Sequence, residues 1–470
     1  MKNYNLTNKI YLIIFFLITN FFYLNSLYKN KIYSLNLAIF TIILILIIFS
    51  NLFFFFIKKE LDYFPINFFF NLYILITTLF FFNNIDYIYK NIYSSLFHDL
   101  DFKSYNLDLN NFIKFSENSL FVLILTTLFF NLGFFLNIFF FKKKNFNFFD
   151  QINEIKLIKL NIFIIFIKII LFITNFFIGS YLNQLLNPTN LLIVSLNFYL
   201  LIKFNKFKLY YLLIILFIFF ENLISTLALY NNIILLILCS TIFYSVKKKI
   251  SLILLIILSL WVLLGQSYKN IFRIYAKNFF SQKIIFFDKA VSTNTNNLNN
   301  YGLRPIIIRG TEPVLSLIRI QELELLSNKK IRKDTLGILK YSLIPRFLYN
   351  SKPKQEYGEW YTENFFNLYK LNPAAKQTTT YNITWPIDFY LNQGLKGSII
   401  ISFFVGYLLS LIIFIFSRFS SNNIHFLLGV SVLSNLSIPD FNFSLMFSPI
   451  LLQYLFLFFI VKIFLIIESK

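Results

Sequence analysis

The sequence predicts an all-α, polytopic integral membrane protein with about 12 transmembrane helices and one large extramembrane loop domain. Hydrophobic residues make up 57% of its 470 residues and aromatic residues 21%. The mean hydropathy is +0.67, and a soluble domain of this length would expose more polar surface. Apolar stretches recur along the chain, and one polar stretch of 131 residues, 267–397, interrupts them.

Each transmembrane helix needs about 20 mostly apolar residues, because the hydrocarbon core is roughly 30 Å thick. Twelve stretches of the sequence meet or approach this length, and the sixth and eleventh are short. They lie at residues 10–25, 35–57, 66–88, 119–141, 158–178, 190–202, 209–225, 228–246, 250–266, 398–417, 424–438 and 445–466.

The cations predict the orientation. If the amino terminus is cytoplasmic, the cytoplasmic segments and short loops hold 17 Lys or Arg, and the opposite short loops hold five. This positive-inside bias places both termini in the cytoplasm and residues 267–397 outside. We expect a membrane region of about nine helices at 1–266, a loop domain at 267–397, and a membrane region of about three helices at 398–470.

Residue types exclude several kinds of site. A single cysteine, Cys239, excludes an intrachain disulfide. The only histidines, His98 and His425, do not lie in a group with metal-ligand spacing, so we expect no metal and no cofactor. The net charge of +22 is typical of topology signals in a membrane protein, so we expect the bilayer and no nucleic acid as partner.

Arginine is concentrated in the external stretch, which holds six of the seven arginines but only 13 of the 36 lysines. A guanidinium group offers a planar fork of donors that suits phosphate and carboxylate. Within this stretch, QELELLSNKKIRKDTLGILKYSL predicts short amphipathic helices that lie against the membrane or cover a cavity. The six arginines are Arg273, Arg304, Arg309, Arg319, Arg332 and Arg346.

Two segments carry a resemblance to a known family. They are SLIPRFLYNSKPK at 342–354 and TWPIDFYLNQGLKGSI at 384–399, and the upstream string IIIRGTEPVLSLI is similar to the family's loop entry. Together they resemble the Wzy-type polymerases of O-antigen and capsule repeat units, in which such segments end a long periplasmic loop. The matching positions are Ile344, Pro345, Arg346, Lys352, Pro353, Pro386, Asp388, Tyr390, Asn392, Gly394 and Gly397.

The resemblance implies a metal-independent glycosyltransferase of the bacterial inner membrane. It would polymerise undecaprenyl-pyrophosphate-linked oligosaccharide units at the periplasmic face, with a chain-length regulator protein as a further partner. The sequence departs from the family at two places. Asp388 stands where the family often has Glu, and ISTLALYNN replaces a serine-arginine pair at the entry of a middle span.

The substrate-binding residues that we expect are Arg309, Arg346, Lys352 and Tyr390. Arginines beside a leaving pyrophosphate would stabilise its charge. The alternative is that loop arginines are solvated or contact lipid headgroups, and we assign the other four to that role.

A base for the acceptor hydroxyl could be Glu312 or Asp388, which we take as the catalytic residues. Each has a structural alternative. Glu312 could pair with Arg309 three residues earlier, and Asp388 could cap a turn. Gly394 and Gly397 are expected to allow a tight approach into the span at residue 398.

Two other function classes remain open. An O-antigen ligase shares this architecture, but ligases often place a histidine in the external loop, and this stretch has none. A flippase or other transporter would not need a 131-residue external stretch and usually shows repeats.

Lys168 and Glu221 lie inside expected spans. Because ions are costly in hydrocarbon, they could form a mutual pair or line a polar cavity, with Lys168 reaching the interface as the alternative.

Overall fold

The computed structural model describes residues 35–58, 64–93, 108–140, 153–178, 183–204, 207–225, 229–247, 251, 253–258, 260–261, 303–341, 357–365, 383–418, 423–437, 439 and 442–469. These residues form helices and connecting turns, and none of them lies in a strand. The elements are α2 (Leu35–Lys58), α3 (Phe64–Asn83), α4 (Ile85–Tyr87), the π-helix η1 (Ile88–Tyr93), α6 (Leu109–Phe140), α7 (Glu154–Ile178), α8 (Asn183–Lys203), α9 (Lys208–Ser225), α10 (Leu229–Lys247), α13 (Leu303–Ser327), the 3₁₀-helix η5 (Gly337–Tyr341), α14 (Tyr357–Phe365), α16 (Trp385–Gln393), α17 (Leu395–Arg418), α18 (Asn423–Leu433), the 3₁₀-helix η7 (Ser434–Leu436), α19 (Phe443–Phe447) and α20 (Ile450–Glu468).

The apolar helices mark a membrane protein. Among the described residues, four helical segments are long and apolar enough to cross a membrane, namely Leu109–Leu136 of α6, Glu154–Thr174 of α7, Leu395–Phe416 of α17, and α20 itself. Six further expected stretches fall on α2, α3, α8, α9, α10 and α18. The stretch 10–25 lies outside the described residues, and only parts of 250–266 are described, as helix. The total of about 12 spans therefore stays a prediction.

Expected helices differ from the structure at several boundaries, and two of these differences have a clear physical cause. α6 begins at Leu109, ten residues before the expected start, where Asp108 Oδ1 accepts a hydrogen bond of 2.7 Å from the N–H of Asn111. The stretch 445–466 is divided, because α19 ends at Phe447 and α20 begins after its N-cap residue Pro449. Polar capping residues and proline set these ends more than hydropathy does.

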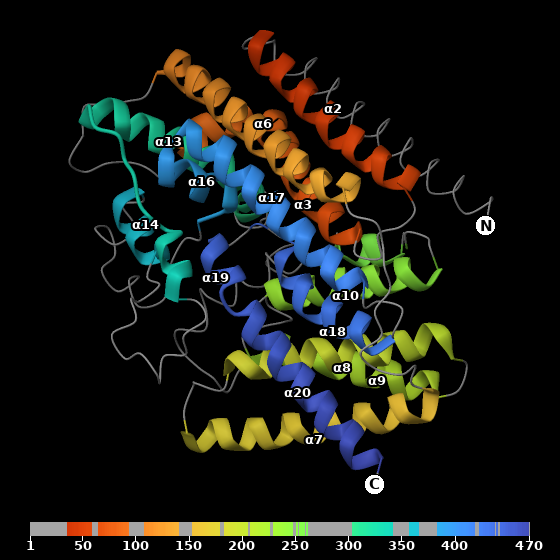
Figure 1. Ribbon diagram of the computed structural model, residues 1–470. Helices are drawn as coiled ribbons and strands as arrows, with labels where there is room; N and C mark the ends of the chain where they lie inside the picture. Colours follow the sequence, from red (N-terminus) through yellow and green to blue (C-terminus); the bar gives the residue numbers. More distant parts are fainter. Residues whose placement is uncertain are drawn as a thin grey trace.

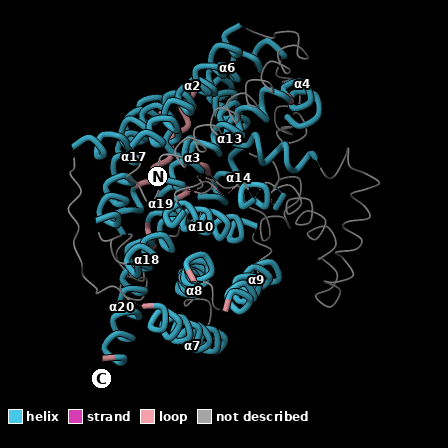
Figure 2. Tube along the Cα trace, turned by 90° about the vertical axis from the view of Figure 1, so that its right-hand side faces the viewer, coloured by secondary structure: helices cyan, strands magenta, loops and turns pink. Residues whose placement is uncertain are grey.

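The helices form two groups (Figure 1). In one, α6 packs against α2 and α17, and α13 packs against α3 and α6. In the other, α8 contacts α7, α9, α10, α18 and α20, and Figure 2 shows α7, α8 and α9 side by side. Contacts of α10 with α3 and of α17 with α18 join the two groups.

Two glycines allow the backbones of α6 and α17 to touch. A Cβ atom at Gly133 would lie 2.0 Å from the carbonyl oxygen of Phe403, and one at Gly406 would lie 2.0 Å from that of Phe130. No side chain fits at either place. Small residues are the usual means by which membrane helices pack closely without a hydrophobic driving force between them.

Amide side chains connect neighbouring helices inside the bundle. Asn161 on α7 and Asn197 on α8 are both buried and exchange two hydrogen bonds of 3.0 and 3.1 Å. Asn131 on α6 donates to Asn71 on α3 at 2.9 Å. These pairs satisfy polar groups that would otherwise be costly in an apolar interior.

An ion pair crosses from α7 to α9. Lys168 Nζ contacts Glu221 Oε2, and the ammonium group also lies 5.9 Å from the centre of the Phe217 ring. Of the alternatives that the sequence left open for these two residues, the structure shows the mutual pair. Pairing lowers the cost of placing both ions inside apolar helices.

We predict that Gly406→Ala lowers the thermal unfolding midpoint of the purified chain in detergent. The added methyl group meets backbone that cannot rotate away, and overpacking of this kind costs about 1–3 kcal/mol. Gly310→Ala is the matched control, because its Cβ would lie 3.3 Å from the side chain of Phe80 rather than against backbone. Equal midpoints for the two variants would contradict the close contact of α6 and α17.

We also predict that Lys168→Met and Glu221→Gln each destabilise the chain, and that the double variant loses less than the sum. A coupling free energy on the order of 1–2 kcal/mol is expected for charges in direct contact inside an apolar region. Thermal unfolding of the four proteins measures it, and strict additivity would show that the pair does not act as a unit.

Candidate functional site

The candidate site is the junction of α13 with α16, together with the connecting segment 328–336; we call it the α13–α16 junction. α13 is a 25-residue helix, whereas the sequence predicted short amphipathic helices in this part of the chain. Residues 311–320 of α13 are all buried. The helix ends where Asn328 takes a positive φ of 50°, a conformation that asparagine tolerates better than most residues.

Arg319 and Glu322 form a buried ion pair on α13. Arg319 Nη1 lies 2.7 Å from Glu322 Oε2, and both side chains are at most 5% exposed. The hydroxyl of Tyr93, at the end of η1, donates to the same carboxylate oxygen at 2.5 Å. Burial, and then the charge of Glu322, raise the pKa of Tyr93 well above its ordinary value, which keeps this donor protonated.

Arg319 also reaches α14. Its Nε donates a hydrogen bond of 3.4 Å to the carbonyl oxygen of Phe365. The network therefore fastens η1 and α14 to α13. Arg319 is therefore a buried structural residue, and the expectation that it is solvated or contacts lipid headgroups is wrong.

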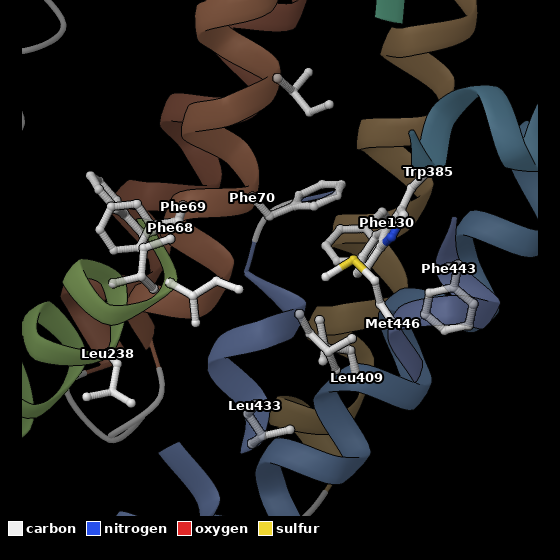
Figure 3. Packing of buried hydrophobic residues seen from close by; sticks show 14 of the residues in the cluster. Phe68, Phe69, Phe70, Phe130, Leu238, Trp385, Leu409, Leu433, Phe443 and Met446 are labelled. Atoms are coloured by element: carbon white, nitrogen blue, oxygen red, sulfur yellow. The ribbon is translucent and has the colours of Figure 1, made fainter. Parts of the chain in front are cut away.

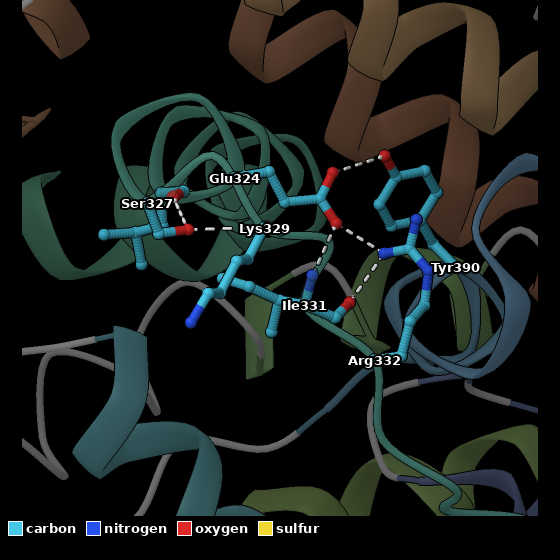
Figure 4. Close-up of polar contacts among 7 residues, drawn as sticks. Glu324, Ser327, Lys329, Ile331, Arg332 and Tyr390 are labelled. Atoms are coloured by element: carbon cyan, nitrogen blue, oxygen red, sulfur yellow. Dashed lines mark hydrogen bonds and ion pairs between the residues drawn. The ribbon is translucent and has the colours of Figure 1, made fainter.

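A second network lies where α13 ends (Figure 4). Glu324 Oε1 accepts hydrogen bonds from Arg332 Nη1 and, at 3.0 Å, from the N–H of Ile331. Glu324 Oε2 lies 3.4 Å from the hydroxyl of Tyr390 on α16. The guanidinium carbon of Arg332 lies 5.2 Å from the centre of the Tyr390 ring. Tyr390, an expected substrate-binding residue, thus holds an arginine in place.

Asp388 on α16 joins three segments. Its fully buried carboxylate accepts hydrogen bonds from the hydroxyl of Thr335 and, at 3.0 Å, from the N–H of Phe443, the first residue of α19. Asn392 donates to Thr335 Oγ1 at 2.6 Å and to the backbone carbonyl of Asp388 at 2.7 Å. The capping alternative for Asp388 is therefore realised, but at the start of α19.

Burial raises the pKa of Asp388 from 3.8 to about 7, against the lowering effect of its donors Thr335 and Phe443. Aromatic rings surround this end of α16 (Figure 3). Trp385 lies 5.7 Å from Phe70, 6.2 Å from Phe130 and 5.2 Å from Phe443, measured between ring centres. This apolar packing removes water and is the physical cause of the raised pKa.

The glycines that follow α16 have the structural role that the sequence predicted. Gly394 has a positive φ of 64° and ends α16. A Cβ atom there would lie 2.7 Å from Arg332 Nη2, and one at Gly397 would lie 2.0 Å from the carbonyl oxygen of Phe389. A side chain at either position would prevent α16, α17 and the connecting segment from packing together.

The other expected residues are placed as follows. Glu312 is buried on α13 at 3% exposure. Arg309 lies on the same helix, but its side chain is outside the description, and Arg346 and Lys352 lie outside the described residues altogether. The structure thus brings Asp388 and Tyr390 together at the α13–α16 junction. No group of three His, Cys, Asp or Glu that could hold a metal ion occurs within the described part of the chain.

Glu324, Arg332 and Thr335 are the residues of the junction that sequence reasoning missed. The arginine concentration pointed to the right stretch, but it could not separate Arg332 from its neighbours. What distinguishes Arg332 is its contact with both Glu324 and Tyr390. These two residues are 66 positions apart in the sequence and meet only in the folded chain.

No known family model matches the chain, and no curated protein and no solved structure is significantly similar to it.

We predict that Asp388→Asn abolishes a fall in stability that the wild-type chain shows between about pH 4 and pH 7. The folded-state pKa of Asp388 is raised to about 7 from 3.8. The native state therefore holds this proton more tightly than the unfolded state, and the resulting stability is complete below pH 4 and lost as the pH rises to 7. The shift is worth on the order of 4 kcal/mol.

Thermal unfolding of the full chain at pH 5 and pH 8 measures this effect. Glu363→Gln, which removes an exposed carboxylate on α14, is the matched control and should keep the wild-type difference. The same difference in Asp388→Asn as in wild type would contradict the assignment of the titration to Asp388.

Proposed function

We propose that this chain joins undecaprenyl-pyrophosphate-linked oligosaccharide units into a surface polysaccharide. The reaction takes place at the periplasmic face of a bacterial inner membrane. The observation that carries this proposal is the structure of residues 384–399, the second family-like segment. Each residue of that segment that the resemblance singles out has a defined place at the α13–α16 junction. Pro386 lies in the first turn of α16, Asp388 and Asn392 hold the connecting segment, Tyr390 contacts Arg332, and Gly394 and Gly397 allow the turn into α17.

The reaction is a displacement at an anomeric carbon. A hydroxyl oxygen of the acceptor glycan forms a bond to that carbon, the bond from the carbon to the pyrophosphate oxygen breaks, and the hydroxyl proton passes to a base. The lipid pyrophosphate leaves with the bonding electron pair. Arginines beside it would stabilise the developing charge without a metal ion. Arg309 and Arg346, with Lys352, are the residues that we propose for this role.

Glu312 and Asp388 are the proposed bases. A carboxylate with a pKa of about 7, as at Asp388, suits a base that works near neutral pH. Its Oδ1 atom already accepts a hydrogen bond from a hydroxyl group, that of Thr335. An acceptor sugar hydroxyl would have to replace the Thr335 hydroxyl as the donor to that oxygen. This exchange of one hydroxyl for another conserves the hydrogen bond to the buried carboxylate.

We predict that Arg346→Ala abolishes long-chain polysaccharide in cells that depend on this chain, at an unchanged protein level. Removing one charge-assisted contact to a leaving phosphate costs about 10²-fold or more in rate. Gel banding of the polysaccharide measures the result. Arg418→Ala is the matched control, because Arg418 ends α17 outside the arginine-rich stretch and should leave the polymer intact.

Unchanged long chains in Arg346→Ala would remove that residue from the mechanism. Deleting the chain separates the function classes. A single repeat unit left on the acceptor agrees with a polymerase, whereas complete loss of transfer would indicate a ligase. Purified protein that moves lipid-linked oligosaccharide across vesicles without consuming it would contradict the proposal.

A further inference from the structure

Arg332 is held in one orientation by its neighbours (Figure 4). Its Nη1 atom contacts Glu324 Oε1 and donates to the carbonyl oxygen of Ile331 at 2.6 Å. The Tyr390 ring lies 5.2 Å from the guanidinium carbon, within the range of a cation–π contact. A free arginine side chain would sample many rotamers. These contacts order it before any ligand binds, so ligand binding does not carry that entropic cost.

The contacts with Glu324 and Ile331 use only one edge of this guanidinium group, at Nη1. Nε and Nη2 are not held by Glu324 or Ile331, and the side chain is 29% exposed. These two N–H groups form the fork that binds two oxygens of one phosphate or carboxylate at once. Gly394 makes room for this edge, since a Cβ atom there would lie 2.7 Å from Nη2.

The position of the group indicates what it meets. Gly394 directly precedes Leu395, the first residue of a segment long and apolar enough to cross the membrane. The fork of Arg332 therefore lies where a candidate span begins, at the depth of lipid phosphates. Lys329, Lys330 and Lys396 are exposed at the end of α13 and the start of α17. Glu324 neutralises the charge of Arg332, so these three lysines supply the net positive charge of this surface.

From these observations we infer that Arg332 binds the pyrophosphate group of a lipid at the outer membrane interface, with Glu324 and Tyr390 as the residues that position it. The choice of a lipid pyrophosphate over an ordinary phospholipid phosphate rests on the proposed function. The chemistry of the contact, a planar fork on two phosphate oxygens, is common to both sources. Arg332, which we expected from the sequence to contact solvent or lipid headgroups, then belongs to the ligand-binding residues of the site.

Binding can be measured on the full chain in phosphatidylcholine nanodiscs, with undecaprenyl pyrophosphate and phosphatidylglycerol as separate probes. We expect Arg332→Lys, which keeps the charge but not the fork, to bind undecaprenyl pyrophosphate about tenfold more weakly. Lys340→Gln removes an exposed charge on η5, which is not part of the proposed site, and should bind within about twofold of wild type. Phosphatidylglycerol should bind the wild-type chain more weakly and respond little to Arg332→Lys.

A chemical measurement on the wild-type chain needs no variant. An arginine-selective dicarbonyl reagent, with the modified residues mapped by mass spectrometry, should label Arg332 less when undecaprenyl pyrophosphate is bound. Equal affinity of Arg332→Lys and wild type, or an equal loss in Lys340→Gln, would overturn the inference. So would protection by phosphatidylglycerol as complete as that by undecaprenyl pyrophosphate. No acceptor sugar is present in these assays, so their outcome is separate from that of the polysaccharide gel.

Discussion

The backbone contact between α6 and α17 is the constraint on which the arrangement of the candidate site depends. Gly133 and Gly406 let the two helices approach until the place of a Cβ atom is 2.0 Å from a carbonyl oxygen of the other helix. α16 is joined to α17 through Gly394, so fixing α17 against α6 also fixes α16. α6 contacts α13 as well. α6 therefore supports both sides of the α13–α16 junction. A close-packed interior deforms little, so the position of α6 determines the positions of both.

Polar contacts then determine how the junction is held once the helices are in place. The carboxylates of Glu322, Glu324 and Asp388 each accept hydrogen bonds from more than one segment, and for Glu324 the second segment is α16, through Tyr390. A buried acceptor or donor that loses its partner costs about 1–3 kcal/mol, and a charged one costs more. A displacement of α13, α16 or the connecting segment would break hydrogen bonds to these carboxylates and would therefore cost free energy. This is the rigidity that a binding or catalytic group needs from its surroundings.

Hydropathy predicted the apolar helices, because length and apolarity are local properties. The cost of an ion in hydrocarbon marked Lys168 and Glu221 as unusual but left their pairing as one of several alternatives. Neither hydropathy nor charge predicted the burial of α13. Its sequence carries Glu312, Arg319 and Glu322, and it becomes buried only because α3 and α6, far away in the chain, pack around it. The role of Arg332 was hidden for the same reason, since Tyr390 and Gly394 are its neighbours only in the folded chain.

The two expected functional residues of α16 serve opposite sides of that helix. Asp388 and Tyr390 are two residues apart, and successive residues of a helix turn by about 100°, so their side chains point in nearly opposite directions. Asp388 fastens Thr335, Tyr390 contacts Arg332, and Thr335 and Arg332 belong to the same short segment. Removing the carboxylate would release that segment and displace Arg332 with it. Loss of activity in a variant of Asp388 would therefore not identify a base. Only a change in the pH dependence of the rate, with Arg332 still able to bind phosphate, separates proton transfer at Asp388 from its role in positioning the arginine.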